Sequence, residues 1–199
     1  IGATNIGRVL GKRYFYLCFI LDFLKGFAPT LGAGLFAGIA GWQAITSTDA
    51  WFWLATMTAA VLGHVFTPWL GFKGGKGVAT SLGALLGVFP HLTIPALALF
   101  ALWLITLAIS RYISVSSIVA GAALPFLCAG YWFMRAAAAK RDSATNIVFS
   151  DGMPFMAIGL LLGILVIWTH RANITRLRSG TEPKVGQRTP ASLAIERPS

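Results

Sequence analysis

Glycines and lysines are concentrated in one short segment whose composition suits an anion. Residues 71–77 read GFKGGKG, with four glycines and two lysines. Glycines let backbone N–H groups approach an anion closely, and a helix N-terminus offers free donors and a positive dipole end. This is not a Walker A loop, because only three residues separate Gly71 from Gly75 and Gly77 stands where Ser or Thr would bind magnesium. The segment predicts a phosphate site, rather than only a flexible basic loop, formed by Gly71, Lys73, Gly74, Gly75, Lys76 and Gly77.

Two further clusters carry anion donors. Thr4 and Arg8 stand four residues apart, so a helix would place both on one face, with Asn5 beside them. The alternative is a helix cap followed by one arginine. Ser114 follows Arg111 and could donate to a phosphate or serve only as a helix cap.

Titratable residues also occur in or beside apolar stretches. His170 and Asn173 would share a helical face at the end of the last stretch, as a proton-handling pair or as interfacial polar residues. Asp22 and Lys25 lie within an apolar stretch, where charges are functional by default but could also neutralise each other. His64, two turns before the glycine segment, could support it, and no chemistry is expected of His91.

The elements that position these residues are membrane helices. Of the 199 residues, 56% are hydrophobic and 11% charged, against about 25% charged in soluble domains, and the mean hydropathy is +0.74. Disorder is excluded by this hydrophobicity. The net charge of +10 suits nucleic acid, an anionic membrane surface or an anionic substrate, and hydropathy favours the membrane over nucleic acid. Cys18 and Cys128 lack any metal-ligand spacing, so neither a metal site nor a cofactor is expected.

A crossing needs about 20 apolar residues. Four stretches fit one crossing each: 14–37, 51–72, 113–134 and 153–169. Residues 77–110 contain no Lys, Arg, Asp or Glu and would form one helix of about 50 Å, which is too long, while Pro90 and Pro95 allow a turn. We therefore expect six crossings. Because 77–89 would be only about 20 Å long, the glycine segment is expected below the membrane surface, buried in protein or lining a watery cavity.

The positive charges test this count, since Lys and Arg collect on the cytoplasmic side. Six crossings with a cytoplasmic N-terminal segment leave three outside, Arg135, Lys140 and Arg141. Twelve then lie inside: Arg8, Lys12, Arg13, Lys73, Lys76, Arg111, Arg171, Arg176, Arg178, Lys184, Arg188 and Arg197. Treating 77–110 as one crossing would give a ratio of only 8 to 7.

Five segments in this order resemble the bacterial acyl-phosphate:glycerol-3-phosphate acyltransferase family, PlsY: IGATNIGR, LDFLKG, GFKGGKGVAT, RYISVSSI and HRANITRLRSGTEPKVG. The resemblance implies an all-α, polytopic integral membrane helix bundle of seven helices. Six are expected in this chain, because the sequence starts at Ile1 and contains no counterpart of the family's first helix or of the serine that precedes GATN. It also implies a membrane domain over residues 1–186, and we expect a disordered cytoplasmic tail over 187–199.

The implied activity moves a fatty acyl group from acyl phosphate to the 1-hydroxyl of glycerol 3-phosphate. The products are lysophosphatidic acid and phosphate, at the start of phospholipid synthesis on the cytoplasmic side of the bacterial inner membrane. An enzyme that makes acyl phosphate is an implied partner. By resemblance, Thr4, Asn5 and Arg8 form the first motif, 71–77 the glycerol phosphate motif, and His170 with Asn173 the third. The expected catalytic residues are Arg8, Lys76, His170 and Asn173, and Ser114 is expected to bind substrate.

Two questions stay open in the sequence. No GxSxG elbow is present and no carboxylate falls in the four polar clusters, which favours direct attack by the substrate hydroxyl. Its proton goes to His170 or to the substrate's own phosphate. A transporter of a phosphate-bearing anion is the alternative function, since broken helices that point N-termini at an anion are typical of transporters. The polar motifs, however, are all expected on one side.

Overall fold

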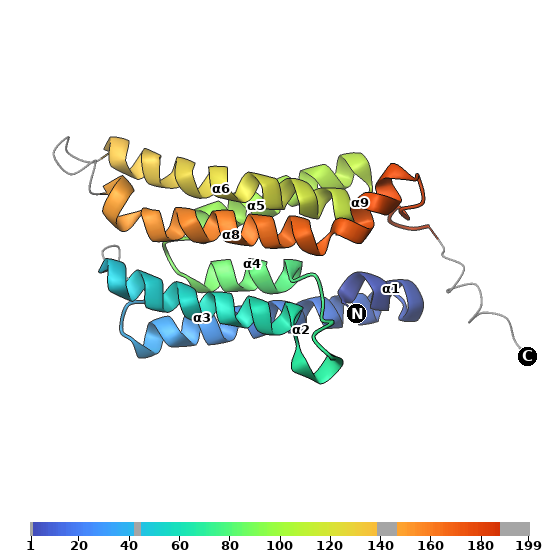
Figure 1. Cartoon of the computed structure of the whole chain (residues 1–199), viewed down its shortest axis with the longest axis horizontal. Helices are drawn as coiled ribbons and strands as arrows, with labels where there is room; N and C mark the ends of the chain where they lie inside the picture. The colour runs from blue at the N-terminus through green and yellow to red at the C-terminus, as the bar shows by residue number, and fades with distance from the viewer. Residues whose placement is uncertain (1, 42–44, 139–146, 188–199) are drawn as a thin grey trace, which may run out of the picture.

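The computed structural model describes residues 2–41, 45–138 and 147–187, and these residues form helices and no strands (Figure 1). This confirms the all-α expectation. The helices are α1 (Ala3–Leu10), α2 (Lys12–Phe36), α3 (Ser47–Val65), α4 (Val78–Gly87), α5 (Thr93–Ser110), α6 (Ile113–Ala138), α8 (Met153–Thr169) and α9 (Arg171–Arg178), with a 3-10 turn η1 (Pro68–Leu70) and a π turn η2 (Ile147–Asp151). The expected tail, apart from Gln187, lies outside the described residues and stays a prediction.

The long helices run side by side along the molecule, and α4 lies between two layers of them (Figure 1). One layer holds α2 and α3, the other holds α5, α6 and α8, and α2 packs closely on α4. Glycines allow this approach, because a Cβ at Gly26 would lie 2.1 Å from the Thr80 carbonyl oxygen and one at Gly83 would lie 2.1 Å from the Phe23 carbonyl oxygen.

Four helical segments are long and apolar enough to cross a membrane: α2, α3 with η1, α5 and α6. A fifth candidate is α8 with α9, which bend by 53° at His170; α9 is polar, so the spanning part is α8. The ten-residue α4 is a shorter apolar helix, about 15 Å long, or half the hydrocarbon thickness. The described residues therefore give four or five candidate spans and one short inner helix, where the sequence predicted six crossings.

The predicted stretches differ from the helices mainly at their ends. The stretch 51–72 was too long as one helix, because α3 ends at Val65 and the chain turns through η1 at Pro68. In contrast, 153–169 coincides with α8, and 113–134 extends by four residues to Ala138. The chain turns between α4 and α5 as expected, although Pro95 lies in the first turn of α5, where a missing N–H costs no helical hydrogen bond.

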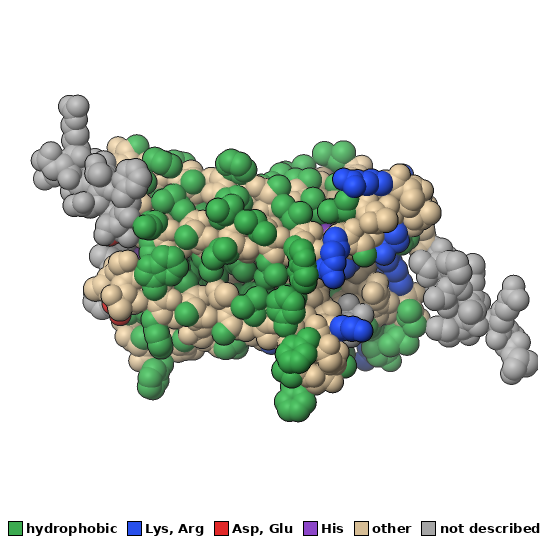
Figure 2. Space-filling model, in the orientation of Figure 1, with side chains coloured by type: hydrophobic (Ala, Val, Ile, Leu, Met, Phe, Trp, Pro, Cys, Tyr) green, Lys and Arg blue, Asp and Glu red, His purple; other side chains and the backbone are tan. Residues whose placement is uncertain are grey.

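Surface chemistry distinguishes the sides of the bundle from one end. On the face in Figure 2, hydrophobic side chains cover the flanks, while Lys and Arg gather at the end that carries α1 and α9. The start of α3 and the α4–α5 turn lie at the opposite end (Figure 1). His91, in that turn, is 1% exposed and its ring stacks on Phe155 with centroids 5.0 Å apart. The polar clusters and His91 are therefore separated by the length of the bundle.

Candidate active site

A cavity that is open on one side lies at the cationic end of the bundle. It lies where α1, the start of α4, the start of α6 and the α8–α9 bend meet. The structure brings together eight residues that the sequence selected from four separate clusters: Thr4, Asn5, Arg8, Lys76, Gly77, Ser114, His170 and Asn173. Thr4 and Arg8 lie on one helix, α1, as their spacing predicted.

Two half-buried cations give this cavity its charge. Burial lowers the pKa of Lys76; Glu182 opposes this shift, while Arg176 and Arg8 add to it. Burial likewise lowers the pKa of Arg8, and the Arg8 guanidinium donates to the Pro183 carbonyl oxygen at 3.4 Å. An anion entering the cavity would offset the positive charges of these two side chains.

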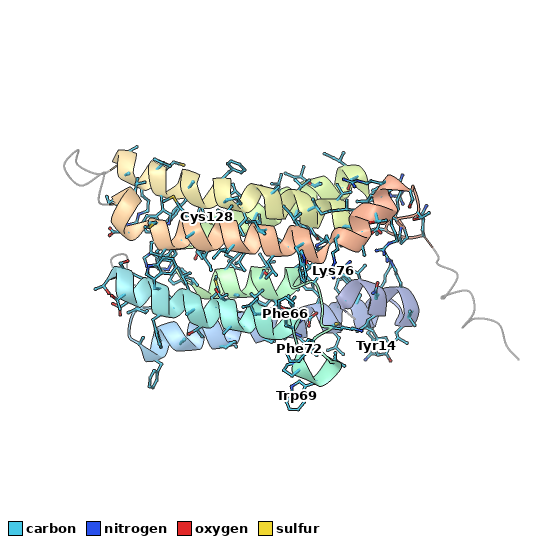
Figure 3. The ribbon with its side chains drawn as sticks, viewed as in Figure 1. Tyr14, Phe66, Trp69, Phe72, Lys76 and Cys128 are labelled. Carbon is cyan, nitrogen blue, oxygen red and sulfur yellow. The ribbon has the colours of Figure 1, made fainter. Side chains whose placement is uncertain are left out.

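One part of the glycine segment lines this cavity, and the other part packs along the end of α3. Gly77, with φ of +79°, precedes α4, and its neighbours Val78 and Ala79 line the cavity, so the first turn of α4 opens into it. In Figure 3, Lys76 lies beside this turn, whereas Trp69 and Phe72 project from the bundle.

Four predicted phosphate ligands of this segment do not line the cavity. Gly71 and Lys73 are exposed and stand apart from it. The N–H groups of Gly74 and Gly75 donate to the carbonyl oxygens of Val65 (3.0 Å) and His64 (3.2 Å). These amides are occupied because the segment packs along the end of α3 on its way to α4. In this structure these four positions therefore lie outside the cavity, and their role in binding an anion stays a prediction.

His170 ends α8 and faces the cavity as a neutral imidazole. It is 2% exposed, and its Nδ1 lies 2.7 Å from the Val166 carbonyl oxygen, which can only accept. Nδ1 therefore carries the proton and Nε2 is left as an acceptor. Burial lowers the pKa of His170 to about 4, despite the opposing effects of the Val166 hydrogen bond and of Glu182.

Glu182 is the site residue that sequence reasoning missed. It follows α9, is 6% exposed, and accepts hydrogen bonds from Asn173 Nδ2 and Arg176 Nε, both at 2.7 Å. Burial raises the pKa of Glu182, but the hydrogen bonds from Asn173 and Arg176, together with the charge of Arg176, outweigh it and the net pKa is lowered. The expectation that no carboxylate lies near His170 is therefore wrong. Its signal was a lone acidic residue within the basic stretch 171–188.

Asn173 and Ser114 complete the polar wall. Asn173 is 3% exposed, and its Oδ1 has no hydrogen-bond partner within the described part of the chain, which leaves a buried acceptor beside the cavity. Ser114 lies in the first turn of α6 and is buried. The Tyr112 N–H, just before α6, donates instead to the Ser110 hydroxyl at 3.2 Å. The Ser114 hydroxyl therefore does not serve as a helix cap.

An apolar groove of about 570 Å³ continues from the polar cavity. The two share Phe19, Val78, Ala79, Trp103 and Ser117. At this junction, Trp103 Nε1 donates to Ser117 Oγ at 3.2 Å. The groove then runs between α4, α5 and α6 to the buried side chains Leu85 and Leu124. The site thus joins a cationic cavity at the end of the bundle to an apolar groove inside it.

The described residues define a class, a helical membrane protein whose cationic cavity opens into an apolar groove. A family model described as glycerol-3-phosphate acyltransferase matches residues 1–180. The chain belongs to this glycerol-3-phosphate acyltransferase family, as its motifs predicted.

Named relatives and solved structures agree. The glycerol-3-phosphate acyltransferases of Aquifex aeolicus (strain VF5) and Thermosynechococcus vestitus are each 40% identical, over 92% and 93% of this chain and 79% and 78% of theirs. Two crystal structures of PlsY, an integral membrane glycerol 3-phosphate acyltransferase, are 37% identical. The lysophosphatidic acid form has a TM-score of 0.66 over 98% of this chain and 81% of that one, and the glycerol 3-phosphate form has 0.67 over 98% and 80%.

Proposed function

We propose that this protein transfers a fatty acyl group from acyl phosphate to the 1-hydroxyl of glycerol 3-phosphate, giving lysophosphatidic acid and phosphate. The observation that carries the proposal is that the polar cavity continues into the apolar groove, because the reaction joins a water-soluble phosphate to a lipid chain. Family membership supports the same acceptor, glycerol 3-phosphate.

Glycerol 3-phosphate occupies the polar cavity. Its phosphate lies between Arg8 and Lys76, the two cations that burial leaves without a full counter-charge. Thr4, Asn5 and Ser114 line the same cavity and supply neutral donors. Asn173 Oδ1, which has no hydrogen-bond partner among the described residues, accepts a hydrogen bond from the 2-hydroxyl and so orients the neighbouring 1-hydroxyl.

Acyl phosphate spans the junction. Its apolar chain lies in the groove towards Leu85 and Leu124, and its phosphate lies in the cavity. The reacting carbonyl is then close to Val78 and Ala79, which line both spaces and begin α4. The first N–H groups of a helix have no acceptor within it, so they can stabilise the oxyanion that forms.

The hydroxyl oxygen attacks the carbonyl carbon, the acyl C–O bond to phosphate breaks, and inorganic phosphate leaves with that electron pair. The hydroxyl proton goes to a phosphate oxygen, because His170 with a pKa of about 4 is a weak base at neutral pH. Before attack, the 1-hydroxyl donates a hydrogen bond to His170 Nε2, which holds it in place, and its proton moves to the phosphate oxygen as the carbonyl is attacked. Arg8 and Lys76 stabilise the negative charge that develops.

The membrane arrangement is part of the proposal. We place residues 1–186 in one membrane-embedded domain, with residues 77–89, which contain α4, as the sixth and short crossing. The cavity end faces the cytoplasm of a bacterial inner membrane, which the 12 to 3 distribution of Lys and Arg supports. A soluble or peripheral enzyme that makes acyl phosphate then delivers it to this side.

No specific observation favours the transporter. Transport needs a polar path to the opposite end, whereas the cavity continues into a groove that ends on buried leucines. A direct assay decides between the two functions. Purified protein in lipid vesicles, given acyl phosphate and labelled glycerol 3-phosphate, should form labelled lysophosphatidic acid and equimolar phosphate without nucleotide. Uptake of label without acylation would instead support transport.

A further inference from the structure

A buried carboxylate and a histidine meet behind the glycine segment. Asp22 of α2 is 9% exposed, forms an ion pair with Lys25, and has Oδ1 3.7 Å from His64 Nδ1 of α3. Its other oxygen, Oδ2, lies 3.8 Å from the Cys18 thiol. A charged side chain within an apolar span is costly and is retained where it has a partner or a task. Lys25 satisfies the charge, so the contact with His64 needs its own explanation.

The His64 ring fills the space beneath Gly75. A Cβ at Gly75 would lie 2.2 Å from His64 Nε2 and 2.6 Å from its Cε1, and the three nearest atoms all belong to this ring. The His64 carbonyl oxygen also accepts the Gly75 N–H at 3.2 Å. His64 therefore contacts Asp22 on one edge of its ring and the glycine segment on the other.

Lys76 follows Gly75 directly and is held from the opposite side. Its carbonyl oxygen accepts from Thr169 Oγ1 of α8 at 3.2 Å. The segment is thus fixed between α3 and α8 at the point where the Lys76 side chain enters the cavity. A displacement of Gly75 would move this side chain with it.

We propose that Asp22 and His64 are positioning residues for Lys76. The carboxylate orients the imidazole, and the imidazole sets how closely Gly75 approaches α3 and hence where the Lys76 ammonium lies. This inference rests on the proposed function, in which Lys76 binds the phosphate of glycerol 3-phosphate. Nε2 packs against Gly75, and this geometry assigns His64 to support of the segment rather than to proton transfer.

Asp22 and His64 also form a wall between two spaces. Both line the site cavity, and both line a second cavity on the other side, with Lys25, Thr67 and Gly74. The pair therefore closes the phosphate site from behind as well as supporting its lysine.

A steric double-mutant cycle tests the proposal. Gly75→Ala, His64→Ala and the double variant are compared in vesicles by the KM for glycerol 3-phosphate, by kcat, and by calorimetric binding of glycerol 3-phosphate. Gly75→Ala should raise KM and Kd about tenfold, because its methyl group meets the ring, with a smaller change in kcat. His64→Ala alone should raise them severalfold. The double variant should bind better than Gly75→Ala, since the ring is gone.

A matched control lies next to the histidine. Gly63 is in the same helix, and a Cβ there would meet nothing within 4 Å, so Gly63→Ala should leave KM and kcat unchanged and leave the melting temperature unchanged or slightly raised. Asp22→Asn should weaken binding in the wild type but add little in the His64→Ala background, because the pair acts as a unit.

Each result decides between the alternatives. The proposal would be overturned if the rise in Kd in the double variant equalled the product of the rises in the two single variants. It would also be overturned if Asp22→Asn weakened binding as much in the His64→Ala background as in the wild type. Melting temperatures separate positioning from loss of fold. If His64 and Gly75 served only to hold the fold together, the variants would melt at lower temperatures and the double variant would not bind glycerol 3-phosphate better than Gly75→Ala. Binding by calorimetry needs no turnover, so wild-type protein that binds glycerol 3-phosphate without acylating it would refute the proposed function alone.

Discussion

At the scale of single residues, Arg8 and Lys76 show how burial prepares a site for an anion. Both are half-buried, burial lowers the pKa of both, and Glu182 is the carboxylate that opposes this effect. Glu182, however, already accepts from Asn173 and Arg176. Its charge is shared among several donors, so the cavity retains affinity for a further negative group.

Arg8→Ala and Lys76→Ala should each reduce lysophosphatidic acid formation by at least about 10²-fold, the cost of losing one group that stabilises developing negative charge. Lys73→Ala is the control, because Lys73 belongs to the same segment but is exposed outside the cavity. Initial rates with labelled glycerol 3-phosphate measure all three. Equal losses for Lys73 and Lys76 would contradict the division of the segment.

His170→Ala should lower the rate by about 10- to 100-fold and leave the acidic limb of the pH profile in place. The pKa of His170 is lowered to about 4, so the imidazole stays neutral as pH falls from 8 to 5. A phosphate monoester, with a second pKa near 6, titrates within this range. The profile of kcat/KM should therefore fall near pH 6 in both proteins. A limb near pH 4 that vanishes in the variant would make His170 the base.

The residues predicted from sequence were those whose motifs are contiguous. The clusters around Arg8, Lys76 and His170 could be found because short spacings put several donors together, and the structure gathers them at one cavity. Glu182 could not be found in this way, since it contacts its partners Asn173 and Arg176 only because the chain folds back onto α9. Glycines in the segment 71–77 were ambiguous, because close backbone packing and anion binding demand the same residue type.

At the scale of elements, the site depends on how closely α4 approaches α2. Its first turn opens into the cavity, and its glycine-rich face lies against the α2 backbone at Gly26 and Gly83. A short helix can be held at this depth only by such contacts, because it lacks the length to be fixed at both membrane surfaces.

Gly26→Ala should destabilise the protein by about 1–3 kcal/mol, the usual cost of overpacking, because its methyl group would lie 2.1 Å from the Thr80 carbonyl oxygen. Gly32 of the same helix is the matched control, since a Cβ there meets nothing within 4 Å. Gly32→Ala should be neutral or stabilising by up to about 1 kcal/mol. Thermal unfolding in one detergent compares the two, and similar melting temperatures would contradict the close packing.

Element types were predictable, whereas the end of α3 and the bend at His170 were not. Hydropathy located α2, α6 and α8, because a lipid-facing helix must be apolar over its length, and α5 was found only with the help of Pro90, Pro95 and the distribution of Lys and Arg. The end of α3 at Val65 depended on the return of the glycine segment, whose hydrogen bonds to α3 leave no pattern in hydropathy. The bend at His170 is equally invisible, since α8 continues directly into α9.

At the scale of the whole molecule, the arrangement predicts which end faces the cytoplasm. Single cysteines are introduced at the exposed positions Arg178 and Thr48, in protein whose Cys18 and Cys128 are replaced by alanine. A membrane-impermeant thiol reagent added to intact cells should label Thr48→Cys and leave Arg178→Cys unlabelled until the cells are opened. Labelling of both before opening, or the reverse order, would contradict the proposed orientation. The expected outer residues Lys140 and Arg141 lie outside the described residues.

The shared wall of cavity and groove places the chemistry at a boundary between two solvents. Five residues, from Phe19 to Ser117, belong to both spaces. Phosphate released on the polar side returns to water, and the new lipid returns to the bilayer along the groove. Each product partitions into the phase it prefers, so neither needs to pass through the other's path.

The rate should then follow the donor's two-dimensional concentration rather than its bulk concentration. Diluting acyl phosphate with inert phospholipid at constant total acyl phosphate should lower the rate in proportion to its mole fraction in the bilayer. Vesicle assays at several lipid ratios measure this surface dilution. A rate that depends only on bulk concentration would mean that the donor enters from water through the cavity.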